Sequence, residues 1–240
     1  MTVYVGSARS DENGKANSGK AGDQKQGKEV STQAWYRDAK GWRVFRAVDP
    51  AVALKIGQCM EEACANDNIG YDQWQRHTLY AQAEKVGFDV KKVKTACETD
   101  CSALVRVCLA FAGIMGIPEE FRTGNMPDYL LKTGAFVELK ESKYTTGAEW
   151  LGYGDILVTK TSGHTVVVIS DGKYYTRELP EGSLKVKSGS WNIRTGPGTQ
   201  YPVAAVVHGG DVLAEADTEG WTAIEHNDRL LWISNKALEG

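Results

Sequence analysis

The feature of this chain that most constrains its fold is a change of hydrophobic pattern near residue 134. Before it, apolar residues recur at helical spacing in residues 49–64, 71–87, 99–113 and 126–133. After it come the short runs FVELK, GDILVTK, HTVVVIS and KYYTREL, which are rich in Val, Ile, Tyr and Thr and separated by Gly or Asp. The DGK between the last two is typical of a hairpin turn. Helices followed by consecutive strands predict an α+β domain with an antiparallel sheet.

Two of the expected helices carry clear start signals. Asp49 precedes Pro50, and a capping carboxylate followed by proline at the first helical position is typical of a helix start. In residues 99–113, Thr99 or Asp100 serves as the cap and Gly113 follows the end. This cap places Cys101 in the first turn, where free backbone N–H groups and the positive end of the helix dipole favour a thiolate.

The pattern changes again after the segment PEGS, residues 180–183. From there to the end, strand-like runs of about five residues alternate with Gly-rich turns, which is typical of a small all-β barrel. We therefore expect two domains, residues 1–179 and 184–240, joined by a linker at 180–183. Within the first domain, residues 1–31 form a polar, Gly-rich N-terminal segment in which VYVGSAR is a candidate strand.

Composition narrows the functional class. The chain of 240 residues has 42% hydrophobic and 25% charged residues, which is ordinary for a soluble globular protein. Its net charge of -3, without a basic stripe, does not suggest nucleic-acid binding. No run approaches the roughly 20 apolar residues of a membrane helix, and the N-terminus lacks the order of a secretory signal. We therefore expect a protein made in the cytoplasm, with its five cysteines as free thiols.

Cys101 is a candidate nucleophile if a base lies near it. The sequence has four histidines, and His164 differs from the others because it opens the apolar run HTVVVIS directly after an SG turn. A histidine at a strand end is held rigidly and can face a cleft, so Cys101 and His164 form a candidate catalytic pair. The alternative is that the two residues are unrelated, one in the core and one on the surface.

A metal site is a competing explanation for the cysteines. Cys97 and Cys101 are four positions apart and Cys59 and Cys64 are five apart, whereas zinc sites favour tighter C-x2-C pairs with further ligands. Cys108 lies on the apolar stripe of its helix, and we interpret it, like Cys59 and Cys64, as a buried hydrophobic residue. We expect neither a metal nor a cofactor, and we assign no task to Cys97.

The segments TDCSALVRVCLAFAG and GYGDILVTKTSGHTVVVISDGKYY together resemble the NlpC-type, papain-like peptidoglycan hydrolases. That family has Asp-Cys-Ser-Gly/Ser/Ala-Leu-Val at a helix start, then a Gly-Asp-Leu strand, and then a Gly-His that begins the next strand. The related CHAP domains share this layout. The match covers about residues 66–178. It implies a papain-like fold for the first domain, with Cys101 as the nucleophile and His164 as the general base.

The resemblance also implies supporting roles for other residues. Asp100 and Ser102 flank the nucleophile and support its thiolate. Tyr71 is similar to a tyrosine that helps at the substrate or oxyanion site, although it lies far upstream, and a packed aromatic residue is an equal alternative. The third catalytic residue, which orients the histidine, falls near Thr176, with Asp171 as the alternative.

The tail WNIRTGPGTQYPV resembles the N-V-R-x-G-P-G-x-x-Y-x-V signature of bacterial SH3 domains, over about residues 184–240. Such domains commonly bind cell-wall peptides or glycan. The resemblance implies wall binding by Trp191, Asn192, Arg194, Tyr201 and Trp221. For the three aromatic residues of this set, a place in the core of the barrel is the alternative.

Together the two resemblances imply a phage or prophage endolysin that acts on peptidoglycan, of the Gram-positive type. Its Cys/His thiol mechanism would cleave an amide bond of the stem peptide, as an endopeptidase rather than an N-acetylmuramoyl-L-alanine amidase. It would reach the wall after holin-type release, or as an exported or host-lysing protein.

Three alternatives stay open at this point. Residues 1–31 are either a flexible arm or an ordered loop, and their likeness to phage wall hydrolases favours a loop packed on the catalytic domain. The whole chain is either a hydrolase or a non-catalytic wall-binding protein with a degenerate hydrolase domain. A third functional reading is an interbacterial amidase toxin.

Overall fold

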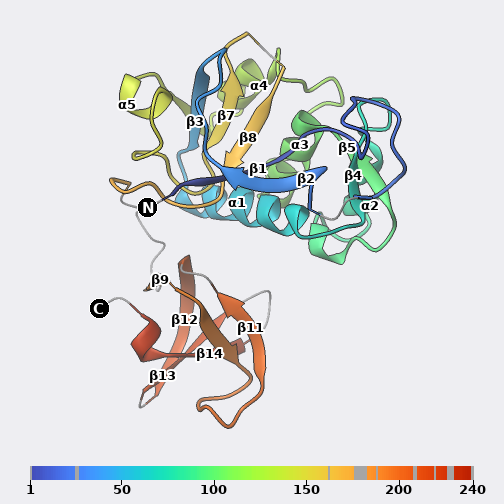
Figure 1. Ribbon diagram of the computed structural model, residues 1–240. Coiled ribbons are helices and arrows are strands. Elements are labelled where there is room, and N and C mark those ends of the chain that lie inside the picture. Colours follow the sequence, from blue (N-terminus) through green and yellow to red (C-terminus); the bar gives the residue numbers. More distant parts are fainter. Residues whose placement is uncertain are drawn as a thin grey trace. The chain divides into compact units, whose positions relative to one another are not determined.

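The computed structural model divides into two compact units, Met1–Arg177 and Glu178–Gly240 (Figure 1). It describes residues 2–24, 27–161, 163–175, 183–187, 189–207, 210–218, 220–225 and 230–238. Of the linker expected at 180–183, residues 180–182 lie outside these ranges, and Ser183 opens the first strand of the second unit. Among the helices in the described ranges, none has the length and apolar character that crossing a bilayer requires.

In the first unit, strands and helices are interleaved along the chain. Three strands precede the first helix, so the expected order of helices first and strands afterwards is wrong. Residues 30–47 hold two strands that the sequence analysis did not identify. The elements are β1 (Tyr4–Ala8), β2 (Val30–Ala34), β3 (Trp42–Ala47), α1 (Pro50–Cys64), β4 (Ile69–Tyr71), α2 (Thr78–Glu84), η1 (Val90–Lys92), β5 (Cys97–Thr99), α3 (Cys101–Phe111), α4 (Met126–Lys132), β6 (Phe136–Leu139), α5 (Ser142–Thr145), β7 (Ile156–Thr159) and β8 (Thr165–Val168).

A six-stranded sheet forms the centre of this unit, in the order β2-β1-β8-β7-β3-β6, with every neighbouring pair antiparallel. β7 and β8 are buried along their whole length, which explains their continuous apolar sequences. Successive side chains point to opposite faces: Val158 packs into the core under α1 and α3, whereas Leu157 packs with Trp42 on the other face. α1 runs across the first of these faces (Figure 1).

The start signals of two helices are confirmed. The carboxylate of Asp49 accepts the N–H of Ala51 ahead of α1, and the carboxylate of Asp100 accepts the N–H of Ala103 ahead of α3. The fourth expected helix, residues 126–133, corresponds to α4. Each of these helices begins at a capping residue or a proline, and the packing of an apolar stripe against the core stabilises it.

The helix expected at residues 71–87 is shorter than predicted. Tyr71 belongs to β4, which pairs in parallel with β5, and α2 begins only at Thr78. Between them, Oδ1 of Asp72 accepts the N–H groups of Trp74 and Gln75, so this carboxylate holds a turn instead of a helix start. In the strand expected to follow the DGK turn, at residues 173–179, Lys173 and Tyr174 instead form a turn, and residues 176–179 lie outside the described ranges.

The N-terminal segment is an ordered loop fastened to the rest of the unit, and the flexible-arm alternative is wrong for its described residues. After β1, which pairs with β2 and β8, the chain leaves the sheet and returns to it at β2. Between these strands the N–H of Asp23 donates to the carbonyl of Asp67, and the N–H of Tyr71 donates to the Glu29 carboxylate. The carbonyl of Ala16 accepts the N–H of Gln73. These bonds hold the loop against β4 and the turn after it.

The second unit is a single six-stranded arrangement in the order β11-β10-β14-β13-β12-β9. Its described core consists of small and medium apolar side chains, among them Ile193, Ile224 and Ile233. Five of the strands have four or five residues, as expected from the sequence, whereas β12 has nine. The elements are β9 (Ser183–Val186), β10 (Trp191–Arg194), β11 (Val203–Val207), β12 (Gly210–Thr218), β13 (Trp221–Glu225) and β14 (Leu230–Ser234), followed by η2 (Asn235–Ala237).

The Gly-Asp pair before β7 is a structural anchor. Gly154 has φ +88°, and a Cβ at this position would stand 2.1 Å from the carbonyl oxygen of Ala53 in α1. Asp155 is buried, and its carboxylate accepts two hydrogen bonds from Arg46 and one from the N–H of Gly152. Position 154 therefore requires glycine for two reasons: its backbone conformation and the close approach of α1 to the sheet.

We expect Gly154→Ala to destabilise the first unit far more than Gly113→Ala. Both glycines have φ +88°, but a Cβ at Gly113 meets open space. Gly113→Ala should cost about 1–2 kcal/mol from backbone strain, and Gly154→Ala about 2–5 kcal/mol because α1 must also shift. All five cysteines lie in the first unit, so brief thiol labelling at increasing urea concentrations measures its unfolding alone. Equal losses for the two variants would contradict the close-packing argument.

Candidate active site

A buried ion pair fixes the start of α3. Asp100 caps the helix through Oδ1, and its Oδ2 lies 2.8 Å from Nε of Arg76. Arg76 also donates to the hydroxyl of Ser102 (3.0 Å) and to the carbonyl of Phe121 (2.7 Å). Arg76 and Asp100 are both almost fully buried. The sequence analysis missed Arg76, because it lay within a segment expected to be helical and carried no distinguishing signal.

Cys101 follows this cap and is buried at the first position of α3. The backbone N–H groups of Thr165 and Ser102 hydrogen-bond to its sulfur. Burial, and after it the Asp100 carboxylate, nevertheless raise the pKa of the Cys101 thiol to about 12. The expected thiolate at the helix start is therefore corrected to a neutral thiol, since loss of solvation outweighs the two N–H groups.

The contact with Thr165 brings Cys101 to the residue that follows His164. His164 ends the turn between β7 and β8; its N–H donates to the Thr159 hydroxyl, and its carbonyl accepts the N–H of Thr159. The N–H of Gly163 donates to the hydroxyl of Thr123 at 2.9 Å. These bonds hold the backbone of His164 directly before the start of β8, where Thr165 contacts Cys101.

The imidazole of His164 is kept neutral. Its pKa is lowered to about 4 by burial and by the Arg9 guanidinium, while the Asp38 carboxylate acts in the opposite direction. Arg9 follows β1, and Asp38 lies between β2 and β3. A neutral imidazole at pH 7 is able to accept a proton, which is what a general base requires.

Two tyrosines also lie around the thiol. Tyr71 pairs with Thr99 across the β4–β5 ladder, and burial raises its pKa to about 12, with the thiol of Cys101 as a further cause. The Tyr71 hydroxyl accepts a hydrogen bond from Gln73 at 2.9 Å. Parallel pairing of two three-residue strands thus brings Tyr71 beside the start of α3, despite its distance along the sequence.

Tyr36 lies close enough to interact both with Cys101 and with the charged groups that act on His164. Its pKa is raised by burial, by Asp38 and by Cys101, and lowered by Arg9. Arg9 and Asp38 are also the two charged groups that act on His164. Tyr36, Arg9 and Asp38 were missed by the sequence analysis, because no spacing relates them to the nucleophile motif.

Other predicted site residues lie elsewhere or act differently. The hydroxyl of Ser102 donates to Asp100, so only its backbone N–H reaches the sulfur. Asp171 accepts the N–H of Tyr153 beyond the end of β8, whereas His164 precedes the start of that strand. Asp171 is therefore not placed to orient His164. Thr176 lies outside the described residues.

The remaining cysteines do not join this site. All five are free. Cys97 is buried in β5, where its thiol donates to the carbonyl of Asn68 at 3.6 Å, and Cys59 hydrogen-bonds with Cys108 in the core. Within the described part of the chain, no three His, Cys, Asp or Glu side chains lie close enough together to hold a metal ion.

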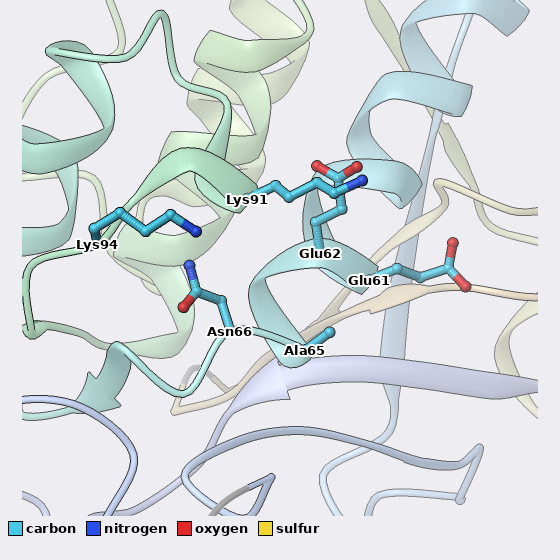
Figure 2. Close-up of a pocket in the computed structure, with 6 residues that line it drawn as sticks. All are labelled: Glu61, Glu62, Ala65, Asn66, Lys91 and Lys94. Carbon is cyan, nitrogen blue, oxygen red and sulfur yellow. The ribbon is translucent and has the colours of Figure 1, made fainter. Parts of the chain in front are cut away.

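An open hollow of about 450 Å³ lies away from this site, at the end of α1. Glu61, Glu62, Ala65 and Asn66 line it from one side, and Lys91 and Lys94 line it from the other (Figure 2). The side chain of Asn66 is committed to the carbonyls of Val90 and Val93. The hollow contains none of the predicted site residues and has charges of both signs, so we assign no chemistry to it.

The wall-binding candidates of the second unit have different environments. Trp191 is half-buried against the core, and its indole N–H donates to the carbonyl of Lys187. Asn192 and Tyr201 are exposed, and Arg194 donates to the carbonyl of Tyr201 at 2.7 Å. Trp221 is half-buried in β13. The two tryptophans are therefore partly buried in this unit, whereas Asn192 and Tyr201 lie on its surface.

The model of a family described as an endolysin-like domain matches residues 5–175, which include Cys101, His164, Tyr71, Arg9 and Asp38. No curated protein and no solved structure matches the chain.

We expect the alkylation of Cys101 by iodoacetamide to be slow at pH 7 and to rise about tenfold per pH unit up to pH 9, because only the thiolate reacts. Cys97 is an internal control, since its pKa is also raised to about 12. Both cysteines lie in one tryptic peptide, and tandem mass spectrometry measures the two rates together. A rate for Cys101 that levels off below pH 7 would contradict the neutral thiol.

Proposed function

The chain belongs to the endolysin-like domain family, and from this premise we propose that its first unit is a peptidoglycan hydrolase. The family points to lysis of the cell wall, with peptidoglycan as the substrate. We further propose a Cys/His thiol mechanism that cleaves an amide bond of the stem peptide, and an NlpC-type or CHAP-type, papain-like arrangement. The contact between the Cys101 sulfur and the N–H of Thr165, next to His164, is the observation that carries this proposal.

The first step of the proposed mechanism starts from the neutral thiol of Cys101 and the neutral imidazole of His164. His164 accepts the proton of Cys101 as the sulfur attacks the carbonyl carbon of the scissile amide, so the thiolate forms only with substrate in place. The new S–C bond gives a tetrahedral oxyanion. When it collapses, the C–N bond breaks and the imidazolium returns the proton to the leaving amine. Water, deprotonated by His164, then attacks the carbonyl carbon of the thioester. The C–S bond breaks, and the imidazolium returns the proton to the sulfur of Cys101.

Tyr71 is suited to stabilise the oxyanion. Its hydroxyl accepts from Gln73, which leaves its own proton for a substrate oxygen. A pKa of about 12 keeps that proton on the oxygen throughout the working pH range. In this mechanism Tyr71 supplies a neutral hydrogen-bond donor beside the nucleophile. Backbone N–H groups near the start of α3 supply further donors, as at other helix starts.

Asp38 supplies a negative charge that acts on His164, whereas Asp171 lies beyond the far end of β8. It is the carboxylate that raises the pKa of His164, and so it stabilises the imidazolium that forms when the proton leaves Cys101. Thr176 stays a prediction. Asp100 acts through its cap on α3 and its ion pair with Arg76, and its negative charge opposes the thiolate.

The second unit is proposed to be an SH3-like module that binds the wall. The exposed side chains of Asn192 and Tyr201 support contact with peptides or glycan of the wall. A binding module joined to a hydrolase raises the local concentration of substrate at the active site. The proposed place of action is the cell wall.

We expect Cys101→Ser to reduce the clearing of purified Gram-positive cell walls at least about a thousandfold, since a serine hydroxyl is a far weaker nucleophile here. His164→Ala should do the same without weakening sedimentation of the protein with walls. Cys97→Ser is the matched control, four positions away and equally buried, and should retain activity within about twofold. If Cys101→Ser clears walls as fast as the wild type, the nucleophile is wrongly assigned.

We expect the acid limb of kcat/KM on a soluble muropeptide to have an apparent pKa near 4, well below the ordinary histidine value of 6.5. Arg9→Gln should move this limb to higher pH, because the guanidinium lowers the pKa of His164. Asp38→Asn should move it to lower pH, because the carboxylate raises that pKa. A shift of both variants in the same direction would refute the assigned charges.

A further inference from the structure

The turn at residues 72–76 is fastened directly to the start of α3. The N–H of Asp72 donates to the carbonyl of Thr99 at 3.1 Å, two residues before Cys101. At the other end of the turn, Arg76 forms its buried ion pair with Asp100. The turn is therefore positioned by the same residues that position the nucleophile.

The backbone within this turn is held rigidly. One carboxylate oxygen of Asp72, itself buried, accepts the N–H of Trp74 at 2.6 Å and that of Gln75 at 2.9 Å. The N–H of Gln73 donates to Ala16 in the N-terminal loop, and its side chain donates to Tyr71. Such a turn presents its side chains at low entropic cost to a ligand.

Trp74 is the side chain that this turn presents to solvent. It is 81% exposed, more than any other large hydrophobic residue in the described ranges. An indole in water forgoes the favourable free energy of burial, and a rigid, exposed aromatic ring is typical of a binding residue. Its neighbours Gln73 and Gln75 are also exposed, and their uncharged amides suit hydroxyl and acetamido groups.

We propose that Trp74 is a stacking platform for a pyranose ring of the wall glycan, namely the sugar that carries the scissile stem peptide. This inference rests on the proposed function and adds a substrate determinant to it. Tyr71, three residues before Trp74, lies beside the Cys101 thiol, so a sugar on the indole places the first residues of its stem at the nucleophile. The enzyme then prefers stems that are still attached to glycan.

The test compares two soluble substrates with the same stem peptide, one bearing its disaccharide and one without sugar. Trp74→Ala should reduce the ratio of kcat/KM for the glycan-bearing over the sugar-free substrate about tenfold, the size expected for one aromatic contact. Trp74→Phe should restore most of the ratio, because a phenyl ring also stacks. Trp150→Ala removes another exposed tryptophan of the first unit and should leave the ratio unchanged. An equal loss on both substrates, or no loss, overturns the proposal.

A binding measurement separates this proposal from the proposed function. Cys101→Ala protein is titrated with the intact disaccharide-peptide and with oligomers of N-acetylglucosamine by calorimetry, with and without Trp74→Ala. Saccharide binding that depends on Trp74, in a protein whose wild type cleaves no wall substrate, supports the platform and refutes the hydrolase. Cleavage by the wild type with saccharide binding that does not depend on Trp74 refutes the platform and leaves the hydrolase in place.

Discussion

The buried pair of Arg76 and Asp100 is the interaction on which the rest of the site depends. Two opposite charges removed from water are stable only while each satisfies the other, and removing one partner typically costs about 3–5 kcal/mol. Here the pair also carries geometry, because Asp100 caps α3 and Arg76 holds Ser102 and the carbonyl of Phe121. The pair therefore fixes the start of α3, Cys101 and the turn before α2 relative to one another.

The protonation state of Cys101 is determined by burial more than by the helix terminus. The partial positive charge of a helix start and two N–H groups favour a thiolate, yet enclosure of Cys101 and the adjacent Asp100 carboxylate outweigh them. His164 is enclosed in the same way and loses its proton for the same reason. A neutral thiol reacts slowly with small electrophiles, and in the proposed mechanism the proton of Cys101 is transferred only when substrate has bound.

The sequence predicts local features well and long-range pairing poorly. The helix starts at Asp49 and Asp100 follow from capping chemistry, and the burial of β7 and β8 follows from their apolar runs. The helix expected from Tyr71 begins only at Thr78, because the carboxylate of Asp72 closes a turn ahead of it. β4 and β5 have three residues each, too few for a period, and their pairing brings Tyr71 to the thiol. The order of strands in the sheet, which the sequence does not reveal, is what brings Arg9, Asp38 and Tyr36 to the site.

The position of β8 in the sheet has a consequence for folding during synthesis. Among the described residues of the first unit, this strand is the last one along the chain, yet it lies between β1 and β7 in the sheet. Until it leaves the ribosome, β1 has no neighbour on that side, and the sulfur of Cys101 lacks the Thr165 amide. Such distant pairing slows folding, since the loop must close before its contacts form. An incomplete chain thus has Cys101 but not the proposed catalytic site, and the proposed activity comes only with the finished unit.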